Sequence, residues 1–297
     1  MTQHKLGKQQ FPGGFTVIGT GRLGTALASR LHHKRYRVHS LFNRSEASCR
    51  KLAEETGTRL YGTFPEERNQ LGDLVFLAVP DDQIAVVAKK LADRFPDLSG
   101  SAWVHTSGAT PADVLRPLAD CGASVAAFHP VQTFHKKNRQ SAFDRCFVTL
   151  QGDPDLCGEL KHVVQVLGAR PLVVDEQQKM AIHLAAVLVC NYYAALFFGA
   201  QKVLKEHHVE VRSRELFGPI VTQTVDALLN APPDEVLTGP VVRGDTGSIE
   251  KHLSLLKAIP EWDQLYRSLG RETLALARKI PGRDTSADRQ LELVFNG

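Results

Sequence analysis

The sequence lacks any paired cysteine motif. Its cysteines are five in number and far apart, and no two of them form a Cys-x-x-Cys pair: Cys49, Cys121, Cys146, Cys157 and Cys190. Disulfide frameworks and zinc sites need paired or clustered cysteines, so the sequence predicts neither, and we expect no metal site. Reduced thiols are typical of the cytoplasm, which is the compartment we expect.

The chain also has little net charge. It carries 36 Lys and Arg against 32 Asp and Glu, a net charge of +4, and the basic residues are scattered. Nucleic-acid-binding domains concentrate basic charge on one face, so we expect no nucleic-acid partner. A mildly basic protein still accepts an anionic ligand.

Long uninterrupted apolar runs are missing as well. Crossing a bilayer takes about 20 apolar residues, and the longest candidate, Met180 to Ala200, is interrupted by His183 and Asn191. We interpret it as a buried helix and expect no membrane association. The start, MTQHKLGKQQFPGG, has charges but no apolar core, so residues 1–10 are expected to form a disordered lead rather than a signal peptide.

Up to residue 175, short apolar runs alternate with stretches of helical spacing. The runs are FTVIG, YRVHSLFNR, DLVFLAVP, AWVHTSG, SVAAFHP, CFVTLQG and RPLVVD. This alternation predicts a doubly wound, mostly parallel sheet with right-handed crossovers and helices on both faces, which is a Rossmann arrangement. Beyond 175 the strand signals stop, and helices are expected at 178–206, 212–230, 248–258 and 261–279. We therefore predict a dinucleotide-binding domain at 11–175 and an all-helical domain at 176–297.

A glycine motif follows the first apolar run. The residues Gly19, Thr20, Gly21, Arg22, Leu23 and Gly24 fit the pattern G-x-G-x-x-G. The pattern alone is weak, but here it follows a strand and opens a helix in the first βαβ unit, the context of a dinucleotide site. Such glycines allow a tight turn, a close approach of the pyrophosphate and close packing of helix on strand, while the helix N-terminus attracts the phosphates.

The end of the second strand indicates which dinucleotide is bound. NAD sites usually place a carboxylate there, whereas this chain has Asn43, Arg44 and Ser45. A guanidinium beside a hydroxyl and an amide suits a 2′-phosphate, so we predict NADP(H). In the alternative, Arg44 is a solvated surface arginine and Ser45 only a helix cap.

Two further loops are expected at the carboxyl edge of the sheet, where ligands of open α/β folds bind. Val79 and Pro80 are expected to lie against the cofactor. Thr106 and Ser107 could bond its ribose or carboxamide, or could simply form a turn.

Candidate proton-transfer groups follow. His129 ends a strand at the same edge and could transfer a proton during hydride transfer, or it could make only an orienting hydrogen bond. Lys179, His183 and Asn191 recur along the helix that opens the second half, and we expect them to form a polar stripe facing a ligand. In the alternative, His183 is a core histidine whose hydrogen bonds are made within the protein.

A polar segment far downstream, GPVVRGDTGSIEKH (239–252), completes the candidates. Asp245 or Thr246 is placed to cap the next helix, which leaves Arg243 and Ser248 without a structural role. We interpret them as a substrate-side or dimer-partner wall of the site; a charged solvent face is the alternative.

The chain resembles the Rossmann-type NADP oxidoreductases related to pyrroline-5-carboxylate reductase, the β-hydroxyacid dehydrogenases, ketopantoate reductase and prephenate dehydrogenase. It is most similar to a bacterial subgroup with a C-terminal helical domain of unknown function. The matching segments are VIGTGRLGTALA, DLVFLAVPDDQI, HTSGA, FHPVQTF, HLAAVLVCNYYAAL and LTGPVVRGDTGSIEKHL. The resemblance implies NADP and a helical domain, similar to that of 6-phosphogluconate dehydrogenase, that dimerises and closes over the nicotinamide.

Catalytic residues transfer less directly from these relatives. The β-hydroxyacid dehydrogenases use Lys-x-x-x-Asn on the first interdomain helix, and this chain has Lys179-x-x-x-His183. The FHP element resembles prephenate dehydrogenases, but the rest of their signature is absent.

We therefore expect an NADP-dependent oxidoreductase acting on a small carbonyl, imine or alcohol. Arg243 and Lys179 would suit a substrate carboxylate, with Asn191 and Ser248 beside it, and His183 or His129 would handle the proton. A non-catalytic NADP-binding sensor is the alternative, and a prephenate-dehydrogenase-like enzyme a third possibility.

Overall fold

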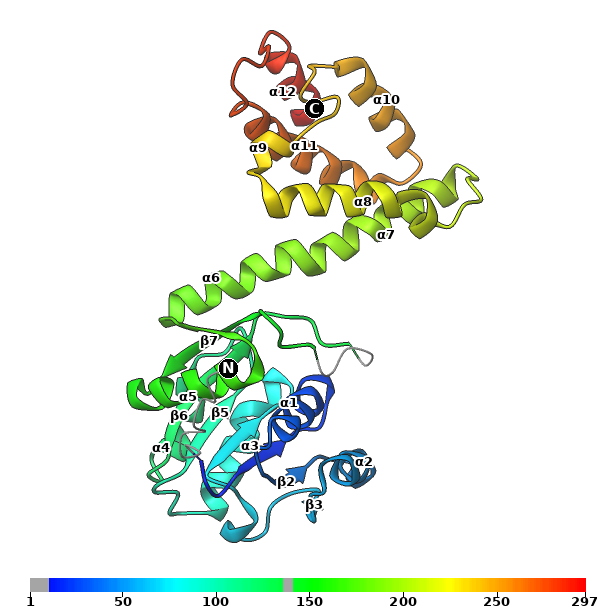
Figure 1. Cartoon of the computed structure of the whole chain (residues 1–297). Helices are drawn as coiled ribbons and strands as arrows, with labels where there is room; N and C mark the ends of the chain where they lie inside the picture. The colour runs from blue at the N-terminus through cyan, green and yellow to red at the C-terminus, as the bar shows by residue number, and fades with distance from the viewer. Residues whose placement is uncertain (1–10, 136–140) are drawn as a thin grey trace, which may run out of the picture. The chain divides into compact units, whose positions relative to one another are not determined.

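The computed structural model describes residues 11–135 and 141–297, so the expected lead at 1–10 lies outside the described residues. The chain divides into two compact units, one ending at Leu188 and one running from Val189 to Gly297 (Figure 1).

The first unit is built on one eight-stranded sheet with the order β3-β2-β1-β4-β5-β6-β7-β8. Six parallel strands form the Rossmann order, 3-2-1-4-5-6. Their bounds are β1 Phe15–Ile18, β2 Val38–Phe42, β3 Leu60–Gly62, β4 Leu74–Leu77, β5 Ala102–His105 and β6 Ser124–Pro130. The predicted Rossmann fold is confirmed, and the carboxyl ends of β1, β4, β5 and β6 lie at one edge.

The last two strands, β7 (Phe147–Gly152) and β8 (Arg170–Val173), run opposite to the other six, so the sheet is mostly parallel, as predicted. β7 pairs antiparallel with β6, and β8 pairs parallel with β7. A parallel neighbour requires a crossover, usually a helix. The segment between β6 and β7 has no helix in its described part, whereas α5 (Pro154–Leu167) makes the crossover from β7 to β8.

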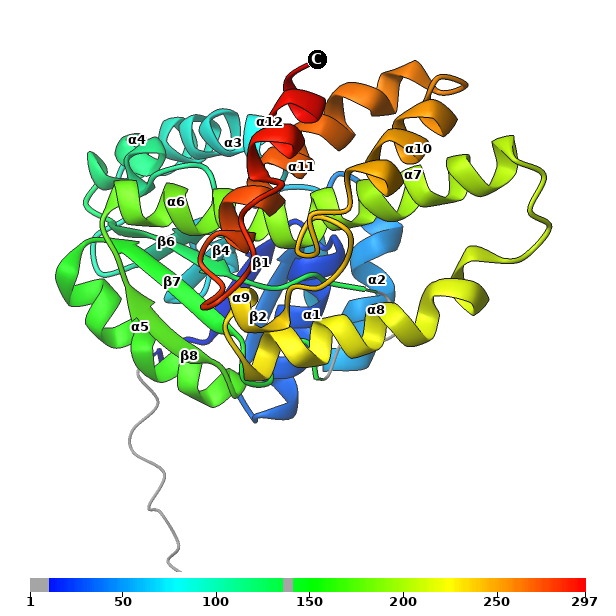
Figure 2. The same cartoon turned by 90° about the horizontal axis from the view of Figure 1, so that it is seen from above.

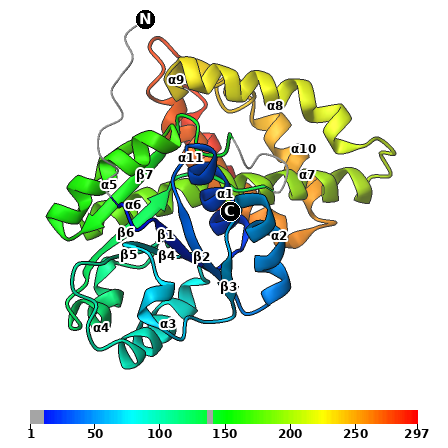
Figure 3. The same ribbon diagram turned by 60° about the horizontal axis from the view of Figure 1, so that its bottom comes forward.

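Helices cover both faces of this sheet (Figures 2 and 3). On one face, α1 (Arg22–His33), α2 (Glu46–Thr56) and α5 bury an apolar core that includes Leu27, Leu52 and Leu160. On the other face, α3 (Asp81–Arg94) and α4 (Arg116–Ala119) bury a second core around Trp103. Two apolar faces explain why the central strands are apolar throughout, since a parallel sheet is buried on both sides.

One long helical run joins the sheet to the second unit. It consists of α6 (Glu176–Ala186), a π-helical stretch (Val187–Tyr192) and α7 (Tyr193–Glu206). The α-helical spacing that places Asn191 on the stripe of Lys179 and His183 therefore stops at Ala186.

The expectation that this run is buried is wrong for the single chain. Of its residues only Lys179 and Gly199 are buried, and Val189 is 77% exposed. By length and composition the run could cross a membrane. An 18-residue window within it has a mean hydropathy of 1.8, and none of the residues in that window is buried. An apolar sequence identifies a face that avoids water, but not what covers it.

The second unit is helical, as expected. Its further helices are α8 (Ser213–Asn230), α9 (Pro233–Val236), α10 (Thr246–Leu256), α11 (Asp263–Ala277) and α12 (Asp288–Asn296). Its core lies among α10, α11 and α12 and includes Ile249, Leu274, Leu291 and Phe295 (Figure 1). Helix α8 adds no buried residue to it.

Candidate active site

The glycine turn between β1 and α1 has the backbone that a dinucleotide site requires. Gly19 has a φ of +105°, and a Cβ there would collide with the carbonyl oxygen of Ala78. Gly21 faces open space, whereas a Cβ at Gly24 would collide with Gly19. These are the three glycine roles of the fingerprint: the tight turn, the approach of the pyrophosphate, and helix packing on the strand. The residues present therefore fit a dinucleotide.

A cavity of about 400 Å³ opens at this turn. Of the predicted cofactor residues, Gly19, Thr20, Gly21, Asn43, Arg44, Val79 and Pro80 line it. Arg22 and Leu23 begin α1, and Gly24 is buried beneath the turn. No carboxylate is among the described lining residues.

Other lining residues escaped the sequence analysis. Ser48 lines the cavity whereas Ser45 does not; Ser45 stands at the N-cap of α2 without a side-chain capping bond. Thr63, Phe64, Gln83 and Val87 also line it. Ser48 could have been found as the hydroxyl one helical turn after Ser45.

The loop after β5 is held by its own side chains. The Ser107 hydroxyl donates to Asp81 Oδ2 at 2.7 Å and accepts from the Thr110 backbone N–H at 3.0 Å. The Thr106 side chain is buried, and its carbonyl accepts from His129. Thr106 and Ser107 thus form the turn that was the alternative to a cofactor contact. A contact between either residue and the cofactor stays a prediction.

Two histidines beneath this loop are uncharged at neutral pH, because burial lowers the pKa of His105 and of His129 to about 4. His105 is fully satisfied: its Nε2 donates to the Pro111 carbonyl at 3.2 Å and its Nδ1 accepts from the Ser107 N–H. His129 donates from Nδ1 to the Thr106 carbonyl at 3.2 Å. The opposite nitrogen of His129, Nε2, therefore carries a lone pair.

His183 comes from α6 and meets His129 across Gly108. The two imidazole rings are 5.8 Å apart in a T-shaped arrangement. A Cβ at Gly108 would fall 2.8 Å from His129 Nε2 and closer still to His183 Nδ1. The space between the two rings thus exists only because residue 108 has no side chain.

Lys179 fixes α6 to the same loop. Its ammonium donates to the carbonyls of Gly108 at 2.8 Å and Thr110 at 2.5 Å, and only 2% of the residue is exposed. Burial lowers its pKa to about 8. Two of its three donors are therefore committed to the backbone.

The segment 239–252 forms a braced turn in the second unit. Asp245 caps α10 by accepting from Ser248 N and Oγ at 3.0 and 2.6 Å, and these bonds lower its pKa. The predicted cap is thus confirmed, and Ser248 takes part in it. Buried Arg283 donates to the carbonyls of Val241 and Val242. Arg243 is exposed, with no bonding partner among the described residues, and Asn191 is exposed in the π-helical stretch.

Comparisons with known proteins match both halves of the chain. The model of a Rossmann-like domain matches residues 6–130, and the model called Domain of unknown function (DUF2520) matches residues 146–273. No curated protein matches the sequence.

Solved structures share the fold over most of the chain. A Bacteroides fragilis protein, provisionally described as an NADP oxidoreductase, is 26% identical with a TM-score of 0.75, over 88% of this chain and 97% of its own. A Thermotoga maritima protein is 24% identical with a TM-score of 0.68, over 89% and 100%. The reductive aminase from Aspergillus terreus, solved with NADPH and ethyl-5-oxohexanoate, is 15% identical with a TM-score of 0.64, over 96% and 98%.

These matches confirm the resemblance drawn from the motifs. At 15% identity the aminase shows the fold alone, whereas the two family models account for both halves of the sequence. The chain therefore joins a segment that matches a Rossmann-like domain to a segment that matches a DUF2520 domain, and it shares the fold of solved oxidoreductases.

Proposed function

We propose that the protein is an NADP-dependent oxidoreductase that moves hydride between the nicotinamide and a small carbonyl, imine or alcohol bearing a carboxylate. One observation carries the proposal. The glycine turn that fits a dinucleotide and the His129–His183 pair lie at the same carboxyl edge of the sheet, because β1 and β6 both end there. This edge is where open α/β sheets bind ligands.

The cofactor assignment rests on the cavity at the glycine turn. Arg44 and Asn43 line it without an opposing carboxylate. A guanidinium binds a 2′-phosphate, whereas a carboxylate would repel it. The Aspergillus terreus neighbour of the same fold was solved with NADPH. These observations favour NADP(H), with Phe64 and Val87 as an apolar wall for the base.

The two histidines suit different parts of a proton transfer. His129, neutral with a free lone pair at Nε2, accepts a hydrogen bond or proton from a substrate hydroxyl. His183, across Gly108 and half-buried, supplies or removes the proton that accompanies the hydride. The Lys179 ammonium positions the loop between them and contributes positive charge toward an anionic substrate.

Substrate binding is assigned to the second unit. The Arg243 guanidinium has no bonding partner among the described residues and stands on a turn braced by Arg283. An unpaired guanidinium on a rigid turn suits a carboxylate, and Asn191 and Ser248 are the polar groups we assign beside it. Carbonyl and imine substrates are included because neighbours of this fold are named reductive aminases and imine reductases.

We further propose that the active form is a homodimer formed through the helical unit. Apolar residues on α7 and α8 remain exposed, among them Phe198, Ile220 and Leu229, the last at 79%. A face this apolar is typical of a permanent interface. The Cys residues of the described chain are all free thiols, which favours the cytoplasm as the compartment.

The direct test is an assay of NADPH oxidation against a panel of keto acids, imines and aldehydes, with wild type, His183→Ala and Arg289→Ala as an exposed control. We expect turnover with at least one carboxylate-bearing substrate, and a loss of about 100-fold or more in His183→Ala. NADPH binding should be unchanged in the variant. Binding of NADPH without turnover of any substrate would favour the sensor instead.

A further inference from the structure

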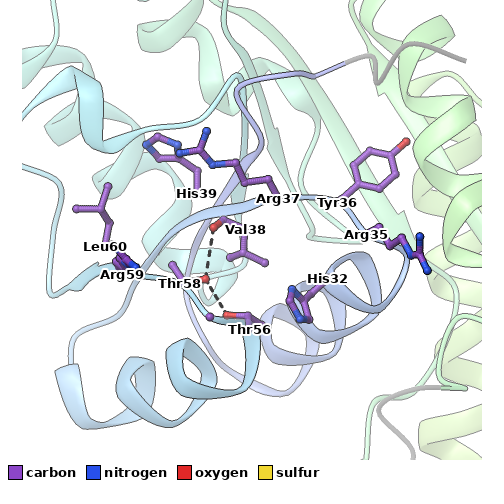
Figure 4. A pocket seen from close by; sticks show the side chains of 11 residues that line it. His32, Arg35, Tyr36, Arg37, Val38, His39, Thr56, Thr58, Arg59 and Leu60 are labelled. Atoms are coloured by element: carbon purple, nitrogen blue, oxygen red, sulfur yellow. Dashed lines mark hydrogen bonds between the residues drawn. The ribbon is translucent and has the colours of Figure 1, made fainter. Parts of the chain in front are cut away.

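A second cavity lies at the opposite edge of the sheet from the glycine turn. It has a volume of about 730 Å³ and is formed where α1 and α2 end and where β2 and β3 begin (Figure 4). Its lining residues share a basic or polar character around a small apolar part: His32, Arg35, Tyr36, Arg37, Val38, His39, Thr56, Gly57, Thr58, Arg59 and Leu60. Strand β2 separates it from Arg44, which follows the other end of that strand.

The lining is strongly biased toward positive charge. Three arginines and two histidines line the cavity, and no described lining residue is a carboxylate. Arg37 precedes β2 and Arg59 precedes β3, and these strands are hydrogen-bonded neighbours. Both side chains are exposed, and neither makes an ion pair or hydrogen bond within the part of the chain that the structure describes.

The helix dipoles explain the position of only some of the basic residues that line the cavity. His32 lies in the last turn of α1, where a basic group complements the negative end of the helix dipole. Arg37 and Arg59 belong to neither helix. His39 adds a second unexplained group: its Nε2 bonds the Asn69 carbonyl at 2.9 Å, but its buried Nδ1 has no hydrogen-bond partner among the residues that the structure describes.

The base of the cavity is already ordered. The Thr58 hydroxyl donates to the Thr56 hydroxyl at 2.7 Å (Figure 4), and the Thr56 hydroxyl in turn donates to the Leu52 carbonyl at 2.8 Å. A preformed concave surface loses little entropy when a ligand binds. Its volume is within the range of small-molecule sites, about 300–1,000 Å³.

We propose that this cavity binds a small phosphate-bearing anion, at a site separate from the dinucleotide cavity. Guanidinium groups form paired, charge-assisted bonds to phosphate oxygens. Several cations in one hollow match a ligand with about two or more negative charges, which a phosphate monoester or diphosphate carries and a single carboxylate does not. A cavity of about 730 Å³ on a chain with a net charge of only +4 favours a small ligand over a nucleic acid.

The test is calorimetric titration of the full chain with pyrophosphate, comparing wild type with Arg37→Gln/Arg59→Gln. We expect the double variant to lower pyrophosphate affinity at least tenfold, and each single variant to lower it about threefold, which keeps the test valid if the double variant folds poorly. Arg116→Gln, an exposed arginine on α4, is the matched control and should bind as wild type.

Further titrations distinguish this site from other binding sites on the chain. Arg44→Gln should leave most of the pyrophosphate binding intact; a loss confined to Arg44→Gln would place the ligand at the glycine turn and overturn the proposal. Unchanged binding in the double variant, or no binding to wild type, would also overturn it. Citrate binding as tight as pyrophosphate would contradict a phosphate site, and an RNA oligonucleotide that pyrophosphate cannot displace would point to a nucleic-acid surface instead.

Discussion

At the scale of single residues, Arg44 determines the predicted cofactor preference. It lines the dinucleotide cavity at the end of β2, where a carboxylate would select NAD. We expect Arg44→Asp to weaken NADPH binding by about 10- to 100-fold, because an attractive charge pair becomes a repulsive one, while NADH binding stays the same or improves. Fluorescence titration with both cofactors measures the ratio. Arg50→Asp, on α2 but outside the cavity, is the control; an unchanged ratio in Arg44→Asp would remove Arg44 from the site.

His129 and His105 give a pH dependence whose sign follows from their depressed pKa values. Each binds a proton in the unfolded chain near pH 6.5 but in the folded chain only near pH 4. Because the unfolded state binds more protons between these values, the free energy of unfolding falls as the pH falls from about 6.5 to 4. Denaturant titrations at several pH values should show this slope, and His129→Gln should reduce it. An equal slope in the variant would mean that His129 keeps its ordinary pKa.

At the scale of secondary-structure elements, the loop after β5 and helix α6 form one assembly around Gly108. A methyl group at this position would lie against both His129 and His183. We expect Gly108→Ala to push the rings apart and to lower kcat by about 100-fold, since small displacements of catalytic groups are costly. NADPH affinity should change little.

Gly158→Ala is the matched control for this substitution, because a Cβ there meets nothing within 4 Å on helix α5. It should leave kcat unchanged and stabilise the fold slightly, as alanine favours helices. Equal activity of Gly108→Ala and wild type would show that the space between the histidines is not used.

Lys179 links the same two elements in a different way. Its ammonium ties α6 to the carbonyls of Gly108 and Thr110, and its pKa of about 8 lies below the ordinary value. The folded state therefore binds fewer protons than the unfolded state between about pH 8 and 10.5, so this group makes the fold more stable as the pH rises through that window. The difference in unfolding free energy between wild type and Lys179→Met should vary with pH there. A difference independent of pH would contradict the depressed pKa.

At the scale of the whole molecule, the proposed dimer decides what covers the apolar face of α7 and α8. We expect light scattering to give the mass of two chains for wild type and of one chain for Ile220→Glu, because a charge buried in an apolar interface is strongly unfavourable. Ile220 is 62% exposed in the single chain, so the substitution itself should not disturb folding. Glu272→Gln, on α11, is the control. A monomeric wild type, or one that binds lipid vesicles, would contradict the dimer.

The Rossmann half and its cofactor turn could be predicted from the order of the amino acids alone. Strand runs, the glycine pattern and Asn43-Arg44-Ser45 act over short stretches of chain, so local spacing and residue type were sufficient to predict the sheet, the helices and the lining by Arg44. The helix cap at Asp245 could likewise be predicted from residues close to it in the chain.

The contacts that join distant segments could be seen only in the folded structure. It brought His129, Gly108 and His183 together, reversed β7 against β6, and committed the Lys179 ammonium to two carbonyls. It also gathered Arg37 and Arg59, unremarkable along the chain, into one hollow. Hydrophobic spacing fixes which face of an element avoids water, but the partner that covers that face depends on long-range packing. The apolar run of α6 and α7 therefore looked buried in the sequence and is exposed in the single chain.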